Sequence, residues 1–173
     1  MHELLHMRRF LVHGVPQIVV NEDYNDWTPE LERGLTNLDN GLEHLVIVPE
    51  EIVRFPVRRQ YWASVMTRKL EGIRVNLLNP DDRRRHALVN WLFIDHVLME
   101  EAQCQSADSL LDELGLRQQA YAFRDAVIPV LAVKEETVRR CLAQLHIPLA
   151  TVALQYIDSR VRRSRAAALE PAI

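Results

Sequence analysis

The stretch that decides the fold is "NPDDRRRHALVNWLFIDHVLMEEA", residues 79–102. Asn79 is a good N-cap and Pro80 fits the first helical position, and two aspartates follow where the helix dipole favours acids. Ten of the thirteen residues from 87 to 99 are apolar. A helix that is apolar on almost every side is surrounded by other elements. The sequence therefore predicts a helical bundle around a central apolar helix at about 80–103.

Hydrophobic periodicity predicts that most of the remaining chain is also helical. Leucines recur every three or four residues from Leu31, which predicts a helix up to residue 39. Segments rich in Val and Ile predict short strands within 8–20, at 43–48 and at 73–78. Further helices are expected over 49–72 in two pieces, 106–115, 116–132, 134–146 and 149–166. The predicted fold class is mainly α (α+β), with a small N-terminal β element.

We expect a mixed α/β lobe at 1–78 and a helical lobe at 79–173, together forming one compact domain. A chain of this length buries a sizeable core without disulfides. Cys104 and Cys141 stand far apart in apolar surroundings, so the sequence predicts neither a disulfide framework nor a metal cluster. The first residues do not resemble a secretory leader, and no apolar run approaches the roughly 20 residues that span a bilayer. These observations favour the cytoplasm and no membrane partner.

Charge is distributed in blocks along the chain. The net charge is −3, but residues 1–53 carry −7 and residues 54–89 carry +6. Residues 90–158 then carry −5, and residues 159–173 carry +3. Blocks of opposite sign most often neutralise one another in the folded protein. A basic block left exposed would instead bind an outside anion.

The segment "LAQLHIPLATVALQYIDSRVRRSR", residues 142–165, resembles a generic helix-turn-helix over about twenty residues. Leu145, Ile147 and Val152 occupy positions where such motifs place hydrophobic residues. The residues that would enter the major groove have no side-chain donor or acceptor; they are 148–150, 153, 154 and 157. Because base edges are read mainly by hydrogen bonds, the sequence does not favour base-specific DNA binding here.

A helix over 149–161 would instead be apolar around roughly 200° of its circumference. Docking on one core requires only about half of that arc. The excess predicts that a second layer covers this helix, contributed by the same chain or by another subunit. The expected interface residues are Leu149, Ala153, Leu154, Ile157 and Val161.

Arginine-rich segments are the candidate sites for anions or nucleic acid. "DDRRRH" places three arginines and His86 at a helix start, where free amides attract anions. Ion pairing with the acidic N-terminal third is the favoured interpretation of that segment. The segment "VRRQYW" combines two basic residues with two aromatic ones, which suits single-stranded nucleic acid but also suits a core with a charged rim. The candidate residues are Arg58, Arg59, Arg83, Arg84, Arg85, Arg160, Arg162, Arg163 and Arg165.

Catalysis is less favoured. A small enzyme site would be built around His86, Asp95 and His96, but the sequence contains no HExxH motif, P-loop or nucleophile elbow. We expect no catalytic residue, no cofactor and no metal ligand. The sequence predicts a non-catalytic regulatory, adaptor or assembly protein that binds another protein and forms a homodimer or larger homo-oligomer. A nucleic-acid-associated regulator is the first alternative, and a small enzyme is the second.

Overall fold

The computed structural model describes residues 1–75, 79–158 and 163–169. It is mainly helical and has a three-stranded antiparallel sheet, which confirms the predicted fold class. Contacts within the chain define two compact units, Met1–Glu43 with Ala126–Ile173 and His44–Asp125. The second unit is thus an insertion in the sequence of the first. This division does not coincide with the boundary expected after residue 78.

The first unit contains the sheet. It begins with α1 (His2–Met7), which continues into the π-helical turn η1 (Arg8–Val12) and is followed by β1 (Gln17–Val20). The long helix α2 (Pro29–Arg54) starts here and continues into the second unit. The C-terminal part of the unit contributes η3 (Ile128–Val130), α7 (Lys134–Leu145), η4 (Leu149–Thr151), β2 (Val152–Asp158) and β3 (Arg163–Ala168).

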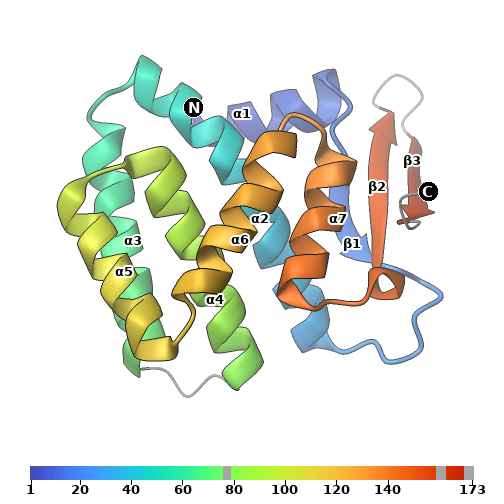
Figure 1. The fold of residues 1–173 in the computed structure, drawn as a ribbon. Helices are drawn as coiled ribbons and strands as arrows, with labels where there is room; N and C mark the ends of the chain where they lie inside the picture. The colour runs from blue at the N-terminus through green and yellow to red at the C-terminus, as the bar shows by residue number, and fades with distance from the viewer. Residues whose placement is uncertain (76–78, 159–162, 170–173) are drawn as a thin grey trace. The chain divides into compact units, whose positions relative to one another are not determined.

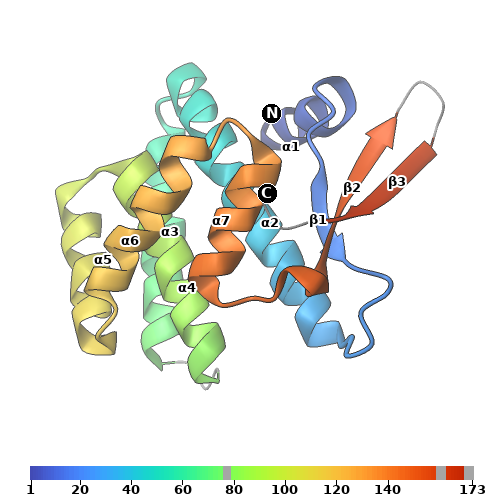
Figure 2. The same cartoon turned by 45° about the vertical axis from the view of Figure 1, so that its right-hand side comes forward.

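Strand β2 lies between β1 and β3, and both pairings are antiparallel (Figure 1). The register aligns Gln17 with Gln155 and Asp158 with Arg163. The start of β2 is buried, whereas β3 is mostly exposed; Figure 2 shows the two strands side by side. The helix expected over 149–166 is therefore wrong. Its described residues form η4 and two strands, because β2 pairs with a strand more than 130 residues earlier in the chain.

The second unit is a helical bundle. Besides its part of α2, it contains α3 (Arg58–Val75), α4 (Pro80–Phe93), the π-helical turn η2 (Ile94–Leu98), α5 (Glu101–Leu114) and most of α6 (Arg117–Val127). Helices α3, α4 and α5 pack against one another (Figure 1). None of the helices in the described ranges is long and apolar enough to cross a bilayer.

The apolar stretch at 79–102 begins a helix, α4, at the predicted position. The Asn79 side chain accepts a hydrogen bond of 2.9 Å from the backbone N–H of Asp82, and Pro80 is the first helical residue. Four consecutive residues, 91–94, are buried. The helix ends earlier than the predicted residue 103, because Met99 adopts a left-handed backbone with φ of 54°. A separate helix, α5, then starts at Glu101.

Three predicted strands are absent from the described residues. Residues 43–48 lie inside α2, which runs through Pro49 as one helix. Its buried face continues the leucine periodicity through Leu45, Val48 and Ile52, so burial outweighs the local signals for a break. Residues 8–12 form η1, while the strand at 17–20 is confirmed. Residues 73–75 belong to α3, and residues 76–78 lie outside the described ranges.

Candidate functional site

The segment α1–η1 has two different faces. One face carries Leu5, which is buried, and the half-buried residues His2, His6 and Arg9. Residues spaced by three or four share a side of a helix. The other face is apolar and exposed, and it carries Met1, Leu4, Met7 and Leu11, followed by Val12. The first face is turned toward the protein interior, and the second faces solvent.

A buried ion network lies next to the inner face of α1–η1. Lys134 of α7 donates to Asp39 at 2.6 Å and to Glu43 at 2.8 Å, both on α2. Arg9 of η1 donates to the other carboxylate oxygen of Glu43. The Lys134 side chain is 5% exposed and that of Glu43 is 1% exposed. Two cations and two anions therefore balance, and the network ties three elements of the first unit together.

The two acids of this network respond differently to burial. Burial raises the pKa of Asp39, and the Lys134 ammonium opposes this rise only in part. Burial would also raise the pKa of Glu43, but the hydrogen bond from Arg9 and the charge of Lys134 outweigh it, so that the pKa lies below its usual value. Glu43 is therefore the acid that the network holds firmly in its charged form.

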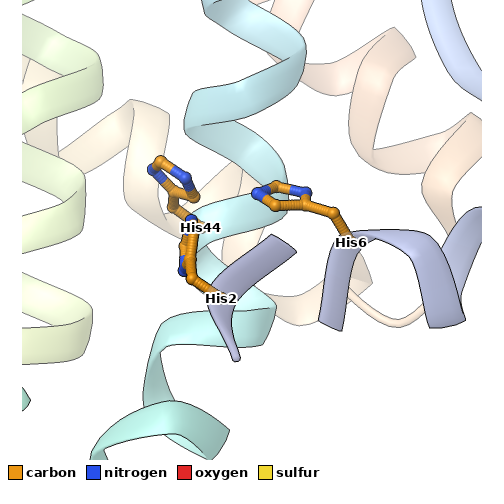
Figure 3. A group of neighbouring side chains, drawn as sticks. All are labelled: His2, His6 and His44. Atoms are coloured by element: carbon orange, nitrogen blue, oxygen red, sulfur yellow. The ribbon is translucent and has the colours of Figure 1, made fainter. Parts of the chain in front are cut away.

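The histidines of α1 lie near this network, since His6 interacts electrostatically with Glu43 and Asp39. His2 and His6 lie one turn apart on α1, with ring centroids 4.9 Å apart. His44 directly follows Glu43 on α2 and is the first residue of the second unit; Figure 3 labels the three side chains. Burial lowers the pKa of His6 and the neighbouring His2 adds to this effect, while Glu43, Glu3 and Asp39 act in the opposite direction.

The sequence predicts no metal ligand, and its motifs do not single out these histidines. Imidazole nitrogens are common ligands of Zn²⁺, Cu²⁺ and Ni²⁺. A local signal was present, since His2 and His6 have the i, i+4 spacing that aligns two imidazoles on one helical face.

The predicted arginines of the second unit do not form one patch. Arg83 donates to the carbonyl oxygens of Ile73 and Arg74 at the C-terminal end of α3, and Arg59 near the other end donates to the carbonyl of Leu98. Arg59 and the carbonyl of Ile73 are separated by about fourteen residues of α3, or about 21 Å along the helix, so Arg59 and Arg83 bind at opposite ends of it. Arg58 pairs with Glu51, and Arg85 pairs with Asp82. The pairing expected between residues 83–85 and the acidic N-terminal third is therefore not seen for Arg83 and Arg85, whose bonds lie within the second unit.

Other arginines leave the anion hypothesis open. The Nε atoms of Arg84 and Arg85 are buried and have no hydrogen-bond partner among the described residues. Arg163 and Arg165 are exposed on β3, whereas Arg160 and Arg162 lie outside the described residues. Anion binding near Arg83–His86 stays a prediction.

The residues of the alternative enzyme site are not brought together as a set. His86 lies near the start of α4, and His96 lies ten residues later in η2, about 15 Å along the helical axis. Asp95 forms an ion pair with Arg124 of α6 at 3.8 Å. His86 therefore lies apart from Asp95 and His96, and the charged groups that act on it are Asp82, Lys69 and Arg85.

The predicted interface residues lie in η4 and β2. Ala153 and Leu154 are buried within the chain, at 3% and 2% exposure. Leu149 and Ile157 are half-buried, and Val161 lies outside the described residues. The argument from an apolar helix does not hold for a strand, so a role of these residues in an interface stays a prediction without that support.

Comparison of the chain with protein-family models, curated proteins and solved structures found no match. Its function is therefore argued from its own residues.

Proposed function

We propose that the protein works by binding other protein molecules, with no chemistry of its own, and that its first partner is a second copy of itself. The exposed apolar face of α1–η1 carries this proposal. Leu4 is 60% exposed, Met7 is 51% exposed and Val12 is 75% exposed. Adjoining apolar side chains of this size on one helical face are typical of a surface that a partner covers.

The inner contacts of the same segment support this proposal. Leu5 is buried and Arg9 is bonded to Glu43, so the inner face holds the segment in place while the outer face is presented to solvent. A preorganised helix loses less conformational entropy on binding than a flexible one. Two copies of such a face would bury their apolar side chains against each other around a twofold axis.

Sedimentation over a range of protein concentrations tests the proposal. The wild-type chain is expected to associate, and Leu4→Glu is expected to remain monomeric because the new charge would be buried in the interface. The control is Val75→Glu on α3, since Val75 is 81% exposed but does not belong to the apolar face of α1–η1. Val75→Glu should associate like the wild type.

Two results would count against the proposal. A wild-type chain that stays monomeric at all concentrations would refute self-association. Binding to lipid vesicles that Leu4→Glu abolishes would show that the apolar face serves a membrane surface, because amphipathic helices can also insert at lipid interfaces.

A further inference from the structure

We propose that the outer edge of β3 (Arg163–Ala168) binds an extended, acidic segment of a partner protein by strand addition. The proposal goes beyond the self-association proposed above and does not depend on it. All of the residues that carry it belong to the first unit. In strand addition, backbone hydrogen bonds to an exposed strand supply the affinity, and side chains at alternate positions supply the specificity.

The backbone groups along the outer edge of β3 point away from the sheet. This strand is the last one in the order β1-β2-β3. The N–H of Leu169 donates to the carbonyl oxygen of Val152 at 3.4 Å, which fixes the residues whose backbone groups point toward β2. Because the direction alternates along an antiparallel strand, the N–H and C=O groups of Ser164, Ala166 and Ala168 point outward. They form a row of donors and acceptors that a further strand can bind.

The edge of β1 on the other side of the sheet is different. By the same alternation the backbone of Ile18 points outward there, since the N–H of Asn21 donates to the carbonyl oxygen of Thr151 at 3.0 Å. The N–H of Ile18 donates to the carboxylate of Asp39, so α2 occupies this edge in part. Strand β3 has neither a proline nor a bulge, two features that commonly protect an edge, and it pairs with β2 without interruption.

The charges of β3 determine which partner fits its edge. Arg163 and Arg165 are exposed, lie two residues apart on one face of the strand, and are accompanied by no acidic residue of β3. On β2 they lie opposite Asp158 and Tyr156, and the Arg165 guanidinium lies 5.5 Å from the centre of the Tyr156 ring. A second copy of β3 would add two more arginines, and like charges on neighbouring strands are destabilising. A segment with acidic side chains at alternate positions would instead pair with both arginines.

NMR titration with synthetic peptides of about eight residues tests the proposal. The full chain carries Leu4→Glu, so that association through α1–η1 does not contribute. One peptide alternates threonine with glutamate, and its control alternates threonine with lysine. At millimolar concentration the acidic peptide should shift the amide signals of Ser164, Ala166 and Ala168 and slow their hydrogen exchange. The lysine peptide should leave these signals unchanged.

Two changes separate strand addition from simple charge attraction. The acidic peptide methylated at its backbone nitrogens has no N–H donors and should not bind. In the chain, Ala166→Pro removes one outward N–H and none of the bonds to β2, and it should weaken binding about two- to tenfold. The matched control is Ala166→Gly, which keeps that N–H and should bind like the parent chain. Replacing both Arg163 and Arg165 by Gln should weaken binding about two- to thirtyfold.

Three results with the peptides would overturn the proposal: no shift of the three amide signals, equal binding of the lysine peptide, or equal binding of the methylated peptide. Shifts of the same signals with protein concentration alone would assign the edge to a second copy and refute the acidic partner. If Ala166→Pro does not fold, the methylated peptide still decides, because it leaves the chain unchanged. A wild-type chain that stays monomeric in sedimentation would refute only the self-association through α1–η1.

Discussion

Replacing Lys134 by Met is the most informative test of the first unit. The Lys134 ammonium is the cation bound to Asp39, and it shares Glu43 with Arg9. Its removal leaves the Asp39 carboxylate, 10% exposed, without that ion pair, while Glu43 keeps its bond to Arg9. Breaking a buried ion pair from one side costs about 3–5 kcal/mol.

We expect a cost near the lower end, about 3 kcal/mol, because only one of the two acids loses all of its ion pairing. For a chain of this size the urea dependence of the unfolding free energy is about 2 kcal/mol per molar, so the midpoint should fall by about 1.5 M. Urea titration followed by circular dichroism measures this shift. The matched control on the same helix is Arg140→Met, which removes an exposed ion pair with Glu136 and should cost at most about 0.5 kcal/mol.

A double variant identifies the cause of the loss. Lys134→Met with Asp39→Leu removes the stranded carboxylate together with its cation, and should recover most of the lost stability, because a buried ion pair can be replaced by apolar side chains at little cost. The reasoning would be refuted if Lys134→Met cost no more than Arg140→Met. It would also be refuted if the double variant were less stable than Lys134→Met alone.

Three further predictions concern single residues. Burial lowers the pKa of His86, so its NMR titration midpoint in the folded chain should lie below 6.5, and a midpoint above 6.5 would contradict this. The folded chain should also lose stability as the pH falls below 6.5, because the unfolded chain binds the proton first. Cys104 should react with a thiol reagent in the folded protein, whereas Cys141 should react only after unfolding, because Cys141 is fully buried and burial raises its pKa. Two reactive thiols in the native state would contradict this prediction. His146→Gly should stabilise the chain by up to about 1 kcal/mol in thermal unfolding, because His146 ends α7 with a left-handed φ of 54° that glycine adopts more readily. Gly115→Ala should destabilise the chain, because Gly115 has a left-handed φ of 67°.

Local signals in the sequence predicted several helix boundaries correctly. Asn79 and Pro80 begin α4, and Gly115 ends α5 with a left-handed backbone. The end of α7 near residue 146 was also predicted. These boundaries depend on hydrogen bonds and backbone angles within a few residues, which explains why composition and spacing reveal them.

Long-range packing explains the errors. Pro49 lacks the N–H that a helix interior requires, yet α2 continues through it because Val48 and Ile52 are buried on the same face as the leucines before them. Val152 and Leu154 gave a helical pattern in isolation, but they pair with β1 from the other end of the chain.

The order of the strands along the chain affects how the protein is made on the ribosome. Strand β1 leaves the ribosome early, but its partner β2 follows more than 130 residues later, after the whole inserted unit. At synthesis rates of about 5–20 residues per second, β1 therefore waits roughly 7 to 26 seconds with its backbone unpaired. During that interval the inserted helices have time to fold, whereas the open strand edge is available to chaperones or to other nascent chains.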